Sequence, residues 1–279
     1  MLKENILFSV TIKSKIIRTK VYYYKVKMSK RSSARDGRSR RNRYLKNLTL
    51  SFLGLIILPS LLLWPVSVNP EQRMESFSTQ IWFDQNVTYD LDSLTALYGE
   101  KKDLPRGFEK QSLLALSRFP ELRDTRITFK VSPALIPVAC RPNYFSLFKG
   151  QQNRRYNVWI SSKSRMVPEG VLLHNLPFNA QVSMLAHELG HTYYYEKLSI
   201  AEFIKFGFCY LVNSNYRAKH ERTTDKLVIS RGLGKGLLEN AEFIRDHPET
   251  SDYFSEEGNF LDTYYLTPDE IVKILHDGQ

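Results

Sequence analysis

Residues 183–195 read SMLAHELGHTYYY, and in this otherwise uncharged run His187 and His191 stand on either side of Glu188. With its flanks, the run predicts one long and largely buried helix, with Asn179 as its N-cap. Residues four apart on a helix lie one turn apart and about 40° around its axis, so both imidazoles can reach one ion. Burying two imidazoles and a carboxylate without partners is costly, and a bound metal removes that cost.

The H-E-x-x-H spacing is typical of a zinc site, because zinc accepts imidazole nitrogens in a tetrahedral arrangement. Glu188 is displaced by about 100° around the helix, so it can lie beside the ion without binding it and accept a proton from water. The alternative is an accidental motif in a structural protein that binds no metal. Chance produces the pattern in somewhat under ~1% of chains of this length.

A catalytic zinc ion takes a third protein ligand and keeps one position open. The later segment 217–234, RAKHERTTDKLVISRGLG, places Glu221 and Asp225 four residues apart on one face of a predicted helix. We predict that Glu221 binds the metal and that Asp225 accepts a hydrogen bond from the ring N–H of a bound histidine. Two alternatives remain open: His220 could bind in place of Glu221, or the two carboxylates could form a solvated helix face.

HELGH followed on a later helix by E-x-x-x-D resembles the gluzincin class of zinc metallopeptidases. Within that class, residues 179–195 and 220–234 are similar to a group of uncharacterised, membrane-anchored bacterial zincin-like proteins, and the resemblance covers about residues 175–235. It implies a small sheet whose edge strand runs over the cleft, an active-site helix beneath it, and further helices. It also implies the roles of the site residues, with zinc ligands His187, His191 and Glu221 and catalytic base Glu188.

Elsewhere the patterns favour an α+β fold, because predicted strands come first and helices follow. Residues 126–132 and 156–162 alternate between apolar and polar side chains and predict strands. We take 156–162 as the candidate edge strand for pairing with an extended substrate. Helical spacing covers residues 108–122, 198–213, 216–231 and 234–246. The final segment, TPDEIVKILHDG, predicts a helix with a capping box from Thr267 to Glu270 and a stop at Gly278.

The formal net charge of +11 is concentrated in the first part of the chain. Residues 1–47 hold 15 of the 40 Lys and Arg but only 2 of the 29 Asp and Glu. The remainder therefore holds 25 basic and 27 acidic side chains. Because the basic charge belongs to a tail that carries no recognition motif, we expect no nucleic-acid partner.

Residues 48–68, LTLSFLGLIILPSLLLWPVSV, form a run of 21 residues without a charge, about the length that crosses a bilayer. The basic residues before it predict that the N-terminus stays in the cytosol. We therefore predict a disordered cytosolic tail at 1–47, a single transmembrane helix at 48–68, and an extracytoplasmic zincin-like metallopeptidase domain at 69–279. A cleaved signal peptide and a buried core helix are the alternatives.

The main hypothesis is thus a membrane-anchored zinc endopeptidase that hydrolyses peptide bonds with a zinc-activated water and Glu188 as general base. The alternative is a catalytically silent metal-binding scaffold or sensor of the same fold at the membrane. The sequence does not select the donor that stabilises the oxyanion. It also leaves open whether Cys140 and Cys209 form a disulfide bridge.

Overall fold

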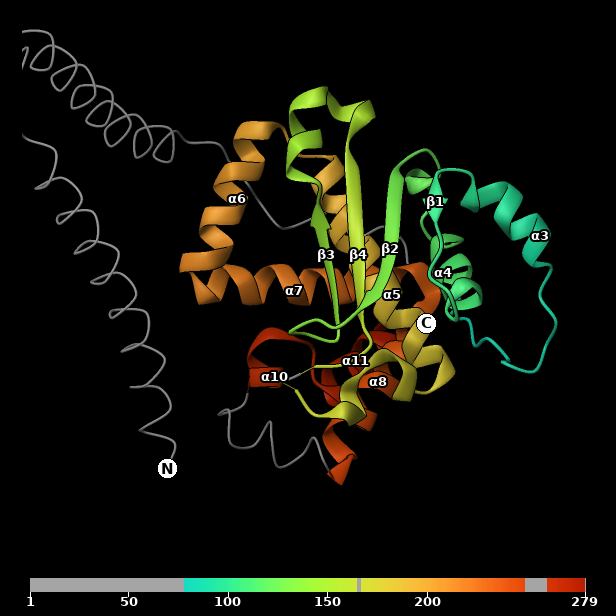
Figure 1. The fold of residues 1–279 in the computed structure, drawn as a ribbon. Helices are drawn as coiled ribbons and strands as arrows, with labels where there is room; N and C mark the ends of the chain where they lie inside the picture. The colour runs from blue at the N-terminus through green and yellow to red at the C-terminus, as the bar shows by residue number, and fades with distance from the viewer. Residues whose placement is uncertain (1–77, 165–166, 249–259, 279) are drawn as a thin grey trace, which may run out of the picture. The chain divides into compact units, whose positions relative to one another are not determined.

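The computed structural model of the protein describes residues 78–164, 167–248 and 260–278. Within these residues, the strands form a mixed sheet in the order β1-β2-β4-β3 (Figure 1). The strands are β1 (Lys102–Asp103), β2 (Arg126–Ser132), β3 (Val138–Pro142) and β4 (Arg155–Ser161). β2 runs parallel to both β1 and β4, whereas β3 runs antiparallel to β4 and forms one edge of the sheet.

Helices form most of the remaining structure, and the prediction of an α+β fold is confirmed. The α-helices are α3 (Leu91–Leu94), α4 (Glu109–Leu116), α5 (Phe178–Glu196), α6 (Ile200–Val212), α7 (Ser214–Val228), α8 (Gly234–Asp246), α10 (Phe260–Tyr264) and α11 (Pro268–Asp277). Short 3₁₀ or π segments are η1 (Thr95–Gly99), η2 (Pro120–Leu122), η3 (Tyr144–Lys149), η4 (Gln151–Asn153), η5 (Glu169–Val171), η6 (Leu173–Asn175) and η7 (Ile229–Leu233).

Most of the predicted elements agree with the structure to within a few residues. The two predicted strands are β2 and β4, and the last helix, α11, begins with the expected capping box between Thr267 and Glu270. The helix predicted at 108–122 is shorter, because α4 ends at Leu116 and Pro120 starts the separate turn η2. Proline has no backbone N–H and cannot continue the hydrogen-bond ladder of the helix.

The prediction that residues 156–162 form an edge strand is wrong. The strand in this region, β4, lies inside the sheet, where β2 and β3 pair with its two sides. The edges of the sheet are instead β1 and β3, and β3 packs against α5. A strand's place in the sheet depends on pairing with distant segments, so alternation along one segment does not reveal it.

Helix α5 is the central element, since it packs against β3, α4, α7 and α8. Its side chains are buried without interruption from Leu185 to Tyr195. The prediction of Asn179 as N-cap is wrong, because the N-cap is Pro177 and the helix starts at Phe178. The Asn179 side chain instead accepts from the backbone N–H of Phe83 at 2.8 Å and donates to its carbonyl at 2.9 Å. This pair of bonds ties the start of α5 to the segment before α3.

Gly190 lets α7 approach α5 closely. A Cβ atom at this position would lie 2.9 Å from Cγ2 of Thr224, closer than such atoms approach in proteins. Glycine therefore allows a contact between the two helices that a larger residue would prevent. The contact lies between His187 and His191 on α5 and faces the part of α7 that carries Glu221.

Two sequence predictions concern residues outside the described ones: the basic tail at 1–47 and the membrane-spanning helix at 48–68. Among the helices that the structure does describe, none combines the length and apolar character needed to cross a bilayer. Cys140 and Cys209 both carry free thiols, so they are not joined by a disulfide.

Candidate metal centre

Helix α5 brings together three side chains that could hold a metal ion: His187, Glu188 and His191. Their nearest ligand atoms all lie within 4.8 Å of one another. All three side chains are buried, with exposed fractions of 3%, 6% and 7%. The helical spacing of the motif thus produces the cluster that the sequence predicts.

Glu221 on α7 completes the cluster. Its Oε2 lies 3.1 Å from Nε2 of His187 and 3.3 Å from Nε2 of His191, and the two Nε2 atoms are 3.0 Å apart. A tetrahedral zinc ion with bonds of ~2.0–2.2 Å holds its ligand atoms roughly 3.3–3.6 Å apart. The three atoms therefore already have nearly the spacing of one face of a zinc coordination tetrahedron.

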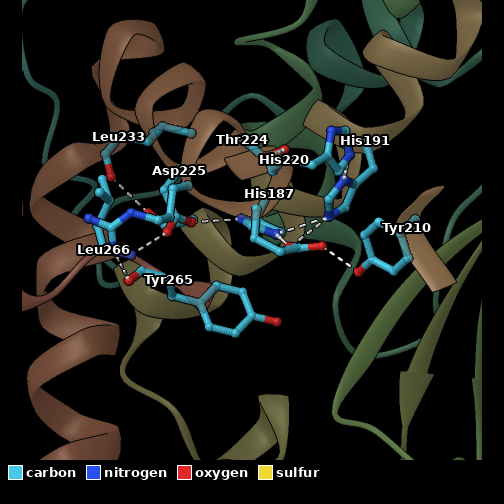
Figure 2. Close-up of polar contacts among 12 residues, drawn as sticks. His187, His191, Tyr210, His220, Thr224, Asp225, Leu233, Tyr265 and Leu266 are labelled. Carbon is cyan, nitrogen blue, oxygen red and sulfur yellow. Dashed lines mark hydrogen bonds and ion pairs between the residues drawn. The ribbon is translucent and has the colours of Figure 1, made fainter. Parts of the chain in front are cut away.

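Asp225 orients His187 from the side opposite His191 (Figure 2). Its Oδ1 lies 2.9 Å from Nδ1 of His187, and its Oδ2 accepts the backbone N–H of Leu266 at 2.9 Å. With both carboxylate oxygens accepting, Nδ1 of His187 donates to Asp225, and Nε2 of the same ring faces Glu221. Asp225 thus lies where a hydrogen-bond acceptor behind a metal-binding histidine is expected.

His220 lies behind His191 rather than beside the metal position. Its Nε2 is 3.0 Å from Nδ1 of His191, the ring nitrogen that faces away from Glu221. Burial, reinforced by the charge of His191, lowers the pKa of His220 to about 3, so its imidazole is neutral. A neutral Nε2 of His220 can accept the Nδ1–H of His191, which turns Nε2 of His191 toward His187 and Glu221. The arrangement therefore favours Glu221 over His220 as the third ligand.

Nε2 of His187, Nε2 of His191 and Oε2 of Glu221 lie within hydrogen-bonding distance of one another, so either a proton or a metal ion could lie between them. Two imidazole lone pairs and a carboxylate oxygen repel one another in a buried site unless a positive charge lies between them. Burial opposes the charged form of His187, yet the carboxylates of Asp225 and Glu221 raise its pKa well above the usual value. Burial would raise the pKa of Glu221, but the two histidines lower it well below its usual range. The cluster therefore favours a cation, and its donor set fits zinc.

Glu188 is the other carboxylate of the cluster. Burial raises its pKa, while His191, His187 and a hydrogen bond from the Cys140 backbone N–H act in the opposite direction. The Glu221 carboxylate is the one within 3.3 Å of both Nε2 atoms, so Glu188 is left beside the metal position. The division between Glu221 as ligand and Glu188 as base stays a prediction, since Glu188 also offers a ligand atom to the cluster.

Two tyrosines near the cluster were not predicted as site residues. Tyr210 on α6 donates a hydrogen bond to Oε1 of Glu221 at 2.5 Å. Tyr265 follows α10, and its ring centroid lies 5.9 Å from that of His187 (Figure 2). The helical periodicity of α6 places Phe206 and Tyr210 on one face, which could have suggested that Tyr210 points inward. No local pattern marks Tyr265.

The burial of these residues tests the remaining interpretations of the sequence. Glu221 and Asp225 are only 3% and 2% exposed, so the solvated helix face is wrong. Among the tyrosines that follow the motif, Tyr195 stacks on Tyr156 and packs against Phe203, which is ordinary core packing.

Searches against protein-family models, curated proteins and solved structures find no match to this chain.

Proposed function

We propose that this protein is a membrane-anchored, zinc-dependent endopeptidase with a gluzincin-type metal site in a zincin-like domain. The observation that carries the proposal is the convergence of three buried acceptor atoms, on His187, His191 and Glu221, beside the carboxylate of Glu188. This set supplies three metal ligands and a base, which are the parts that hydrolysis of a peptide bond requires.

His187, His191 and Glu221 would hold the ion through two Nε2 atoms and one Oε2 atom. Zinc bound there would supply a Lewis acid that lowers the pKa of water and polarises the carbonyl of a peptide bond. Asp225 and His220 would keep each imidazole in the tautomer that presents Nε2. Tyr210 would fix the Glu221 carboxylate through its other oxygen.

Glu188 would take the proton of the attacking water and later deliver it to the nitrogen of the leaving amine. Its burial suits this task because a carboxylate with a raised pKa is a stronger base than one in water. The glutamate needs to move little for either transfer, since its carboxylate is already part of the cluster.

Tyr265, whose ring lies near that of His187, would donate a hydrogen bond to the negative charge that develops on the carbonyl oxygen. Burial raises the pKa of its hydroxyl well above the usual value, so the proton needed for donation stays in place. The backbone around it is held by α7: Arg222 donates to the Tyr265 carbonyl at 2.7 Å, and Asp225 accepts from Leu266. The helix that supplies the third ligand thus also positions this tyrosine.

The free edge of β3 would bind the substrate backbone. The N–H of Asn143 donates to the Arg155 carbonyl, and the N–H of Ser161 donates to the Pro137 carbonyl. Antiparallel ladders alternate, so odd-numbered residues of β3 bond to β4, and Cys140 between them turns away from β4, with its N–H bonded to Glu188 and its C=O directed to the outer edge. An extended peptide could pair there, next to Glu188.

The proposal is tested by purifying the full chain and measuring zinc content together with cleavage of an unstructured peptide library. We expect one zinc per chain and cleavage products in the mass spectrum. Glu188→Gln should keep the zinc and lose cleavage by at least ~10²-fold. Glu100→Gln, at an exposed position away from the cluster, is the matched control and should cleave normally. Zinc without cleavage of any peptide would instead favour the metal-binding scaffold.

A further inference from the structure

Helix α6 is apolar on both of its faces. Its inward face carries Phe203, Phe206 and Tyr210, which pack against Tyr195 and His220. Its outward face carries five large apolar side chains with exposed fractions of 37–80%: Ile200, Ile204, Phe208, Leu211 and Val212. At 100° per residue these five lie within about 120° of one another, so they form one stripe. We call it the α6 stripe.

A second group of exposed apolar side chains lies near the start of α6. The segment η3 between β3 and β4 exposes Tyr144, Phe145 and Phe148, with exposed fractions of 60%, 86% and 73%. The following residues tie this segment to the corner between α5 and α6, because Arg154 donates to the Leu198 carbonyl at 2.7 Å. In Figure 1 the segment and the first turn of α6 both lie toward the upper end of the view. Exposed apolar groups this extensive mark an interaction surface.

The sequence indicates which partner covers this surface. Only nine residues, 69–77, separate the predicted membrane span from Ser78, the first described residue. Nine residues reach at most roughly 30–35 Å when fully extended, so Ser78 of an anchored domain stays within that distance of the bilayer. Interfacial helices combine Phe, Leu and Ile on one face with lysines at its border. Lys205 borders the α6 stripe, and Lys149 ends η3.

We infer that the α6 stripe docks on the surface of the lipid bilayer and holds the metal centre next to the lipid headgroups. The inward face of the same helix reaches the cluster, since Tyr210 binds Glu221 and Phe206 packs on His220 with ring centroids 4.8 Å apart. A helix with its side chains is ~10 Å across. If the outward face of α6 touches the headgroups, the cluster on its inward side therefore lies about one helix diameter from them. If the protein is the proposed endopeptidase, its substrates are peptide segments that lie close to the membrane surface.

The docking is tested without any assay of peptidase activity. The full chain carrying Leu211→Cys and Cys209→Ser is labelled with an environment-sensitive fluorophore and reconstituted in nanodiscs of phosphatidylcholine and phosphatidylglycerol. Lipids with a nitroxide on the headgroup or upper acyl chain then report contact by quenching. We expect quenching at position 211 at least ~3-fold stronger than at a label on Leu97→Cys in the same background, since insertion to the headgroup boundary brings the label to the nitroxide.

Leu97 is a suitable control because it is also an exposed leucine, at 47%, and α3 and η1 lie across the sheet from α6 in Figure 1. Equal quenching at the two positions would overturn the inference. So would a label at 211 that is shielded from water but insensitive to the lipid nitroxides, because a second copy or another segment of the chain would then cover the stripe. Energy transfer between differently labelled copies distinguishes these two outcomes.

A charge variant extends the test to the substrate class. Leu211→Glu, at a position 80% exposed, should reduce quenching at a label on Phe208→Cys. It should leave cleavage of a soluble peptide unchanged and slow cleavage of the same peptide tethered to lipid at least ~10-fold, because tethered encounters depend on effective concentration. Equal rates on both peptides would contradict the membrane-proximal substrate. Loss of docking with intact zinc and peptidase activity would leave the proposed function standing.

Discussion

The hydroxyl of Tyr210 donates a 2.5 Å hydrogen bond to Oε1 of Glu221, while Oε2 of the same carboxylate faces His187 and His191. One oxygen is therefore fixed by α6, and the other faces the two imidazoles. Because the two oxygens belong to one rigid group, the position of α6 influences the position of the Glu221 carboxylate. This relationship connects the surface helix to the candidate metal centre.

Tyr210→Phe should weaken zinc binding by ~10–100-fold, because the carboxylate loses the partner that orients it. The affinity is measured by competition with a chromophoric chelator. Tyr144→Phe, on the exposed segment η3, is the control and should bind zinc as the unaltered chain does. Unchanged affinity in Tyr210→Phe would show that the hydrogen bond does not position the ligand.

Asp225→Asn should also weaken zinc binding by ~10–100-fold, because an amide cannot accept from both Nδ1 of His187 and the Leu266 N–H through two oxygens. The same competition measurement applies. The variant should in addition lower the rate of peptide cleavage at saturating zinc, because Leu266 follows Tyr265 directly. Full activity at saturating zinc would show that Asp225 does not position Tyr265.

The variant His220→Gln tests whether His220 binds zinc itself or only accepts a hydrogen bond from His191. We expect the variant to keep one zinc per chain with reduced affinity, because the glutamine side chain can still accept a hydrogen bond. His191→Ala and Glu221→Ala should lose stoichiometric zinc. Metal analysis after dialysis provides the comparison. If His220→Gln loses zinc while Glu221→Ala retains it, the assignment of the third ligand is reversed.

Tyr265→Phe should lower kcat by roughly 10²-fold with little change in KM and none in zinc content. The reason is that the hydroxyl acts on charge that develops only in the transition state. Steady-state kinetics on a quenched fluorescent peptide measures both constants. A rise in KM with unchanged kcat would instead assign Tyr265 to substrate binding.

Removal of the metal should destabilise the fold. Zinc held at ~1,000 times its Kd would stabilise the folded state by about 4 kcal/mol, so a chelator should lower the melting temperature and added zinc should restore it. Differential scanning fluorimetry measures the shift. The His191→Ala variant should show no response to the chelator.

The sequence predicted the parts of the site that depend on local spacing. His187, Glu188 and His191 share one helix, so helical geometry alone brings them together. Glu221 and Asp225 were found because they also lie one turn apart on a second predicted helix. Their contact with α5 depends on the close approach at Gly190, which is a tertiary property.

What the sequence did not predict depends on contacts between distant segments. Tyr210 and Tyr265 reach the cluster from α6 and from the segment after α10, and no spacing rule links either residue to the motif. The role of His220 depends on which ring nitrogen of His191 it faces. The free edge of β3 and the contact of Asn179 with Phe83 follow in the same way from tertiary packing.

The central claim is that one zinc ion is held between α5 and α7. Anomalous diffraction at the zinc edge, from crystals of the purified chain, tests it most directly. We predict a single peak about 2.0–2.2 Å from Nε2 of His187, Nε2 of His191 and a carboxylate oxygen of Glu221. A chain without anomalous signal at this position, or a metal bound elsewhere with Glu221 turned away from both rings, would contradict the account.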